Sequence, residues 1–179
     1  SQHYIMASSR DWKAALLERL VRFQGARSIL EAGTAYGASA ITMALAQDEP
    51  KLVTIEASPN QGDIGRENIR AEVPEIECVF ENEATAIPRL AAERRFDFIF
   101  HDAAHRGDYY VKAFNAILPA LEPGAMFALD DIQWDDKPAN RTESGDSPIG
   151  CREGWSEILV HDRVSGAVLV NGRIGAALV

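Results

Sequence analysis

The sequence predicts an α/β fold in which a mostly parallel sheet carries helices on both faces. Five short apolar runs alternate with segments of helical periodicity, which is typical of this fold class. Near the C-terminus, two further apolar runs are separated by Asn171-Gly172, a strong signal for a tight antiparallel hairpin. With 179 residues, of which 46% are hydrophobic, the chain 1–179 is expected to form a single domain.

The expected elements follow one another without internal repeats. The strands are expected at 28–33, 51–57, 76–82, 96–102 and 124–131, and the hairpin within 164–179. The helices are expected at 10–24, 37–47, 60–73, 84–95, 108–121 and 152–162.

Two segments outside the alternating core have their own signals. An N-terminal helix is expected within 1–25, because Trp12, Leu16, Leu20 and Phe23 recur at helical spacing and Gly25 follows as a stop. The segment 132–152 is largely polar and rich in Pro, Gly, Ser and Asp, so we expect a substrate loop or lid there.

Composition excludes some classes of partner. The 18 basic and 27 acidic residues give a net charge of -9, which argues against binding to nucleic acid phosphates. No run approaches the roughly 18 apolar residues that span a bilayer, and no signal peptide is evident, so we expect no membrane contact and a cytoplasmic location. Cys78 and Cys151 match no metal-ligand spacing; Cys78 is expected in the core and Cys151 in an exposed position.

Ligands of such sheets bind beyond the carboxyl ends of the strands. The residues expected there are Glu31, Glu56, Asn82, Asp102, Asp130 and Asp131. In "LEAGTAYGASA", Gly33 and Gly37 would let a ligand approach the backbone at a helix start, although glycines after a strand are also ordinary turn residues. Glu56 can accept hydrogen bonds from both hydroxyls of a ribose. Ala35 stands where a dinucleotide fingerprint needs glycine, which disfavours a nicotinamide-dependent oxidoreductase.

The segments "ILEAGTAYGASAITMA", "VTIEASP" and "FDFIFHDAAH" together resemble the class I S-adenosylmethionine-dependent methyltransferases. Among them, the chain is most similar to the small metal-dependent O-methyltransferases of the catechol and caffeoyl-CoA type. The resemblance implies a Rossmann-like seven-stranded methyltransferase sheet and S-adenosylmethionine as cofactor. Glu31 would help to hold the methionine portion, Ser39 its carboxylate, and Glu56 the ribose. The full expected set of cofactor-binding residues is Glu31, Gly33, Gly37, Ser39, Glu56, Asn82, Glu83 and Asp102.

Three aspartates suggest a metal site. Asp102 ends the fourth expected strand, and Asp130 with Asp131 ends the fifth. Like charges this close repel one another unless they are protonated or neutralised by a cation, and oxygen ligands suit Mg²⁺. The resemblance assigns the same three positions to the metal ligands, with asparagine common where Asp131 stands. An alternative is that the two adjacent aspartates only end a strand and begin a loop.

His105 is the expected catalytic residue. It follows Asp102 by three positions, where many members of the resembled family carry a lysine that acts as general base. An imidazole can take the proton of an acceptor hydroxyl whose acidity a metal has raised. His101 would point the opposite way along its strand and face a helix. The acceptor would be a small molecule with a catechol-like or sugar hydroxyl, beside Tyr109 and Trp134.

Two other functions stay open at this point. A metal-independent methyltransferase could act on nitrogen or on a carboxylate, with Asp130 and Asp131 purely structural. A noncatalytic S-adenosylmethionine-binding module could instead recruit a protein partner through the polar segment 135–150. A homodimer is compatible with either.

Overall fold

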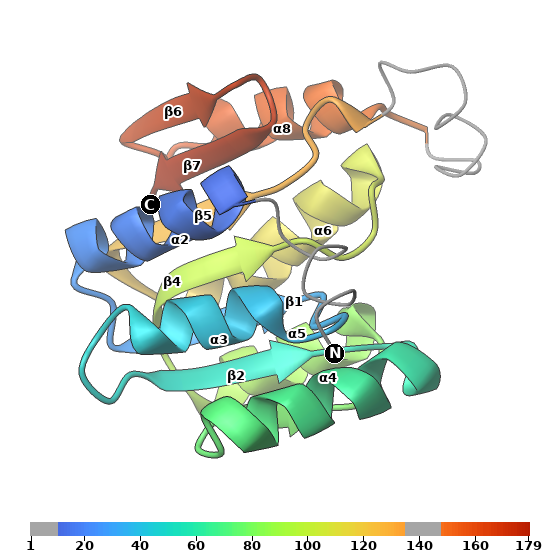
Figure 1. Cartoon of the computed structure of the whole chain (residues 1–179). Coiled ribbons are helices and arrows are strands. Elements are labelled where there is room, and N and C mark those ends of the chain that lie inside the picture. Colours follow the sequence, from blue (N-terminus) through green and yellow to red (C-terminus); the bar gives the residue numbers. More distant parts are fainter. Residues whose placement is uncertain (1–10, 135–147) are drawn as a thin grey trace.

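Seven strands form one mixed sheet in the order β3-β2-β1-β4-β5-β7-β6 (Figure 1). The structure is a computed structural model that describes residues 11–134 and 148–179. The strands are β1 (Ser28–Ala32), β2 (Lys51–Ile55), β3 (Glu77–Val79), β4 (Phe96–His101), β5 (Leu121–Leu129), β6 (Gly166–Val170) and β7 (Ile174–Leu178). Strands β1 to β5 pair in parallel, whereas β7 pairs antiparallel with both β5 and β6. The predicted fold class and the C-terminal hairpin are confirmed.

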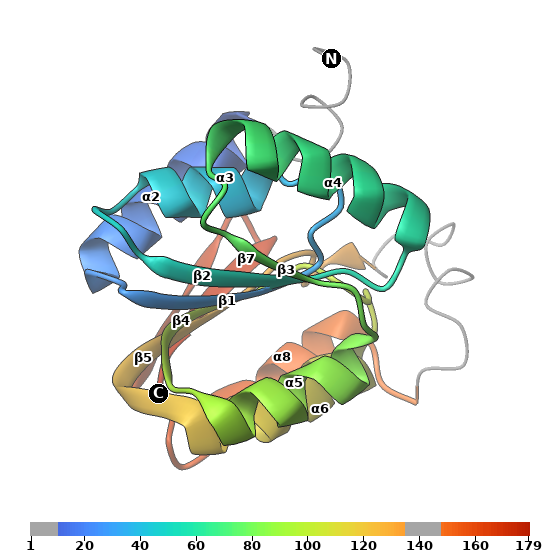
Figure 2. The same ribbon diagram turned by 90° about the horizontal axis from the view of Figure 1, so that it is seen from below.

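Helices cover both faces of this sheet (Figure 2). They are α2 (Asp11–Gln24), α3 (Ala38–Leu45), α4 (Pro59–Glu72), α5 (Glu83–Glu93), α6 (Gly107–Ile117) with the short 3₁₀ helix η1 (Leu118–Ala120), and α8 (Cys151–Leu159). Helices α2, α3 and α4 lie on one face, and α5, α6 and α8 lie on the other. No helix in 11–134 or 148–179 is long and apolar enough to cross a membrane.

The apolar run of β4 fits a strand that helices cover on both faces of the sheet. Phe98 and Phe100 are buried under the α2 and α3 face, whereas Phe96 and Ile99 are buried in the second core with α5 and α6. A strand buried on both faces has apolar side chains at successive positions rather than alternating ones. The connection order places the polar ends of β1, β2, β4 and β5 at one edge, and the strand order reverses between β1 and β4.

Some sequence predictions need correction. In α2, the predicted apolar stripe is displaced, because Leu17 and Val21 are fully buried whereas Phe23 is 78% exposed. Cys151 was expected to be exposed, yet it is completely buried at the start of α8, and Cys78 is only partly buried. Most of the expected substrate loop, 135–147, lies outside the described residues.

Candidate active site

A cavity of about 510 Å³ opens at the carboxyl edge of the parallel strands. It lies where ligands bind in sheets of this topology. The structure brings seven of the predicted site residues to its wall, namely Gly33, Glu56, Asn82, Glu83, Asp102, His105 and Asp131. The other predicted residues, Glu31, Gly37, Ser39 and Asp130, do not line it. Lys13 and Arg173, which had no predicted role, do.

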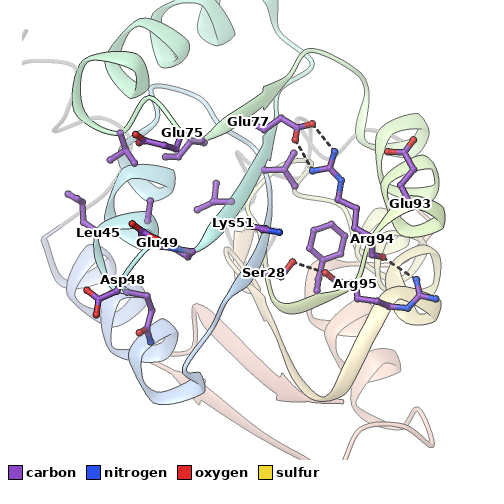
Figure 3. A pocket seen from close by; sticks show the side chains of 18 residues that line it. Ser28, Leu45, Asp48, Glu49, Lys51, Glu75, Glu77, Glu93, Arg94 and Arg95 are labelled. Atoms are coloured by element: carbon purple, nitrogen blue, oxygen red, sulfur yellow. Dashed lines mark hydrogen bonds and ion pairs between the residues drawn. The ribbon is translucent and has the colours of Figure 1, made fainter.

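A second, larger hollow of about 1390 Å³ lies at the opposite edge of the sheet (Figure 3). Ser28 and Lys51, the first residues of β1 and β2, mark this edge, and an ion pair of 2.7 Å joins Arg94 Nη1 to Glu77 Oε2 beside it. Because the carboxyl ends of the strands are the ligand-binding edge in this class of fold, the smaller cavity is the candidate active site.

The glycine turn after β1 is required by the protein's own packing. Gly33 has a φ of 100°, and a Cβ atom at this position would clash with the backbone carbonyl oxygen of Asp102 at the end of β4. Gly37 has a φ of 84°, and a Cβ there would press on Ile69 and the backbone of Gly65 in α4. The sequence leaves two explanations for these glycines, the approach of a ligand and an ordinary turn. The contacts with Asp102 and α4 are sufficient to require glycine at both positions.

Glu56 follows β2 and organises the loops around the cavity. Its Oε2 accepts a hydrogen bond from the backbone amide of Ala35 at 2.8 Å, and its Oε1 accepts one from the amide of Ser58 at 2.7 Å. A carboxylate offers about four acceptor positions, so capacity for roughly two further donors remains. Two neighbouring hydroxyls of a ribose are donors of this kind. Acceptor positions on Glu56 therefore remain for a ribose, and that contact stays a prediction.

Glu31 lies beneath the cavity rather than in its wall. The side chain is completely buried within β1, and the Thr54 hydroxyl donates a hydrogen bond to its Oε2 at 2.5 Å. Burial raises the pKa of Glu31 to about 7, although hydrogen bonds from Ser39 and Thr54 act in the opposite direction. Glu31 Oε1 nevertheless has no hydrogen-bond partner among the described residues, and the contacts of Glu31 and Ser39 with a cofactor stay predictions.

Asn82 and Glu83 begin helix α5 at the rim of the cavity. The Asn82 side chain caps the helix by accepting a hydrogen bond from the amide of Ala84 at 2.9 Å. Glu83 is buried, with Oε2 2.9 Å from Nε2 of the fully buried His101. His101 also packs edge-to-face on Tyr110 of α6, with ring centroids 5.5 Å apart. The prediction that His101 faces a helix, away from the catalytic position, is confirmed.

Asp102 and Asp130 both form ion pairs with a lysine of the N-terminal helix α2. Lys13 of α2 is almost fully buried, and its Nζ lies 2.6 Å from Asp102 Oδ2 and 2.5 Å from Asp130 Oδ2. Burial lowers the pKa of Lys13, but the two carboxylates outweigh burial and the net pKa is raised. Burial raises the pKa of Asp130, and Lys13 and Arg173 outweigh it, so the net pKa is lowered. Lys13 and Asp130 therefore form a charged pair over the neutral pH range.

Arg173 supplies a second cation from the hairpin between β6 and β7. Its Nε lies 3.0 Å from Asp130 Oδ1 and 2.9 Å from Asp131 Oδ1, and its Nη2 donates to Asp130 Oδ2 at 3.3 Å. The amide of Asp131 donates to Asp130 Oδ1 at 2.7 Å. Each oxygen of Asp130 then has two donors, which uses the roughly four acceptor positions of a carboxylate.

These contacts test the predicted metal site. A divalent cation held by Asp102, Asp130 and Asp131 needs a free oxygen lone pair on each carboxylate. Asp130 is completely buried and has none left, so the predicted set of three does not fit a cation in this arrangement. A different group, Asp102, His105 and Asp131, has potential ligand atoms that lie within 4.8 Å of one another.

His105 lies between Trp134 and the acidic cluster, which consists of Asp102, Asp130 and Asp131. Its Nε2 is 3.1 Å from Asp131 Oδ2 and 3.8 Å from Asp102 Oδ1, and its ring stacks on Trp134. Burial lowers the pKa of His105, but the two carboxylates outweigh it and raise the pKa to about 9. The imidazole therefore carries a proton at neutral pH in this arrangement, and it becomes a base only as the pH rises.

Lys13 and Arg173 are the site residues that the sequence analysis missed. For Lys13 a signal was present, because Lys13, Leu17 and Val21 are spaced by four residues and share the buried face of α2. A lysine on an apolar helical face needs a buried partner. Arg173 follows the Asn171-Gly172 turn, and nothing in its local pattern distinguishes it from a surface arginine.

Comparison with known proteins identifies the family. The model of a family described as O-methyltransferase matches residues 2–170. Tricin synthase 2 of Oryza sativa subsp. japonica is 30% identical over 145 residues, a match that spans 75% of this chain but only 48% of that relative. Catechol O-methyltransferase of Niastella koreensis is 30% identical over 158 residues, which cover 86% of this chain and 71% of the relative.

Solved structures agree with the family match. An O-methyltransferase of Bacillus cereus in complex with SAH has a TM-score of 0.79 and 28% identity, over 96% of this chain and 83% of that one. An SAH-bound methyltransferase of Podospora anserina shares the fold, with a TM-score of 0.80 and 18% identity, over 94% of this chain and 78% of that one. From the carboxyl-edge cavity, the family match and these relatives, it follows that the chain belongs to the O-methyltransferase family.

Proposed function

We propose that this protein transfers the methyl group of S-adenosylmethionine to a hydroxyl oxygen of a small molecule. One observation carries the proposal: a single cavity at the carboxyl edge joins Glu56, suited to a ribose, with His105, suited to handle the acceptor's proton. The relatives described as O-methyltransferases, and the Bacillus cereus protein in complex with SAH, support both halves of this assignment.

The chemistry needs little from the protein beyond binding, alignment and proton handling. A lone pair of the acceptor oxygen attacks the methyl carbon, the bond from that carbon to sulfur breaks, and sulfur keeps the bonding pair. The hydroxyl proton leaves to a base, so the products are a methyl ether, S-adenosylhomocysteine and one proton. Glu56 would hold the ribose, and the walls of the cavity would bring oxygen and carbon into line.

His105 is the proposed acceptor of the hydroxyl proton. His105 lines the cavity, and Asp131, 3.1 Å from its Nε2, stabilises the protonated ring. With a pKa of about 9, His105 is a strong base once it has lost its own proton, but only a small fraction is free at neutral pH. The reaction should therefore speed up in alkaline solution.

The acceptor is proposed to be a small phenol. Tyr109 and Trp134 line the cavity beside His105, and flat aromatic rings favour an aromatic ligand. Catechol O-methyltransferase and tricin synthase, the names of two relatives, support a phenolic acceptor. A sugar hydroxyl has no comparable support from these walls.

Magnesium assistance, expected from the sequence, is the less favoured form of this reaction. The group of Asp102, His105 and Asp131 supports it, since its potential ligand atoms lie close together. Against it stand the cations Lys13 and Arg173, which already neutralise the same carboxylates. No metal step is therefore part of the proposed reaction.

The proposal is tested first by calorimetric titration of the purified protein with S-adenosylhomocysteine. We expect one site per chain, and transfer of a labelled methyl group from S-adenosylmethionine to a panel of phenols. Absence of cofactor binding would refute the proposal. Binding without transfer to any phenol or sugar, but with transfer to an amine or a carboxylate, would keep the cofactor and reject the hydroxyl acceptor.

A further inference from the structure

The position of Lys13 has a consequence for the acidic cluster. Its side chain is only 4% exposed, and its ammonium group lies between Asp102 and Asp130, which follow neighbouring parallel strands. It also lies 5.4 Å from the centre of the Phe100 ring. A lysine that gives up water so completely is stable only beside carboxylates. Lys13 is therefore an integral, buried residue of the candidate site and not a surface charge.

We infer that Lys13, together with Arg173, occupies the place of a divalent cation, so that methyl transfer proceeds in this protein without a bound metal. The inference rests on the proposed methyl transfer for its functional consequence. Its physical content concerns only the affinity of the acidic cluster for a cation, which is measured separately.

The charges of the cluster support this assignment. Three carboxylates, Asp102, Asp130 and Asp131, meet at the edge, and each has a contact of 3.0 Å or less to Lys13 or Arg173. Two permanent positive charges leave one net negative charge, and His105 lies 3.1 Å from Asp131. The repulsion among carboxylates, from which the sequence predicts a metal, is thus relieved by the chain itself.

A divalent cation bound by the predicted set of Asp102, Asp130 and Asp131 would have to displace Lys13. It would bring positive charge next to a buried ammonium group, and like charges at this spacing repel strongly where water is scarce. Withdrawal of Lys13 from Asp102 and Asp130 would leave its ammonium group buried beside Phe100, without a carboxylate. Asp130 would also have to release a donor before it could bind a metal, because each of its oxygens already has two.

The inference changes which acceptors are expected. A metal that binds the acceptor favours two adjacent oxygens, because both can chelate it. With Lys13 and Arg173 in place of a metal, the acceptor needs only one hydroxyl, the one that is methylated. A phenol with a single hydroxyl should therefore be methylated as readily as a catechol, provided that it fits between Tyr109 and Trp134.

The deciding measurement is the binding of Mn²⁺, followed by electron paramagnetic resonance with and without S-adenosylhomocysteine. We expect no saturable binding to the unaltered protein below about 1 mM, well outside the range of dedicated carboxylate sites. Removal of one positive charge in Lys13→Met should strengthen Mn²⁺ binding by about tenfold or more. Lys13→Arg, which keeps the charge, should leave binding weak.

Lys51→Met is the matched control. It removes the same charge at an exposed position on the opposite edge of the sheet and should not change Mn²⁺ binding (Figure 3). Saturable micromolar Mn²⁺ binding to the unaltered protein, or unchanged binding in a folded Lys13→Met variant, would overturn the inference. If Lys13→Met does not fold, the unaltered protein still decides: full turnover in a chelator supports the inference, and loss of turnover that Mg²⁺ restores overturns it. Failure to bind S-adenosylhomocysteine would instead count against the proposed function alone.

Discussion

The imidazole of His105 lies flat against the indole of Trp134, with ring centroids 4.2 Å apart and ring planes inclined by 25°. This stack leaves the edge of the imidazole directed at the acidic cluster, where Nε2 is 3.1 Å from Asp131. A carboxylate on one side and an aromatic face on the other fix the ring of the proposed base. Burial lowers the pKa of this ring, but Asp102 and Asp131 outweigh burial and raise it to about 9.

Activity should rise with pH through the pKa of His105. Because that pKa is about 9, kcat/KM should increase from neutral pH and level off only above about 9. His105→Gln should remove this dependence and lower kcat by about 100-fold. A pH–rate profile of both proteins measures this.

His161→Gln is the control for the loss of a histidine, because His161 lies outside the cavity, beside Phe114 and Asp162. It should keep the profile of the unaltered protein. A profile that levels off near pH 6.5, or a His105→Gln variant with full turnover at every pH, would contradict the proposed base.

Glu31 should make the protein less stable as the pH rises. Its folded pKa of about 7 exceeds the ordinary value of 4.5, because burial disfavours the charged form. The stability that it contributes is fully present below pH 4.5 and is lost as the pH rises through about 7. The loss amounts to at most about 3 kcal/mol.

Thermal unfolding between about pH 5 and pH 7 measures this loss. Glu31→Gln stays neutral and should flatten the decline of Tm in that window. The raised pKa of His105 causes a further decline at higher pH, which this variant should retain. Parallel curves for the two proteins below pH 7 would show that Glu31 is charged when folded.

Glu56→Ala should weaken cofactor binding. The substitution removes the proposed ribose ligand and also frees the amides of Ala35 and Ser58, which Glu56 holds at 2.8 Å and 2.7 Å. Loss of charge-assisted hydrogen bonds of this kind should raise the Kd for S-adenosylhomocysteine by about 10-fold to 100-fold. Calorimetry measures the change, with the exposed Glu67→Ala as control. An unchanged Kd would remove Glu56 from the cofactor site.

Gly33→Ala should destabilise the protein more than Gly124→Ala. Both glycines have a positive φ, 100° and 79°, so both substitutions strain the backbone by about 1 kcal/mol. Only the Cβ at residue 33 also clashes, with the carbonyl of Asp102, whereas residue 124 has open space. We expect a total cost of about 3 kcal/mol or more for Gly33→Ala. Chemical denaturation measures the free energy of unfolding of both variants. Equal losses of stability would show that the ends of β1 and β4 can move apart to accommodate the added Cβ atom.

The predictable part of the structure depended on local patterns. Apolar runs at 96–102 and 124–131 indicated β4 and β5, and Asn171-Gly172 indicated the hairpin, because strand and turn preferences act over a few residues. The length of β3 was predicted less well. The expected strand 76–82 is reduced to three residues, and β3 lies at the edge of the sheet, where it pairs on one side only. The buried face of α2 was placed wrongly, because its apolar residues occur all round the helix and only docking selects one face.

Local patterns in the sequence predicted the order of strands and helices, the carboxyl edge as the place of the candidate site, and the acidic residues that meet there. The cations that neutralise those acids could not be predicted in this way, because they come from distant parts of the chain. Lys13 is 89 positions from Asp102, and Arg173 is 43 positions from Asp130. Charge pairing acts through space, so the partner of a buried carboxylate depends on which helix and which hairpin the finished sheet brings beside it.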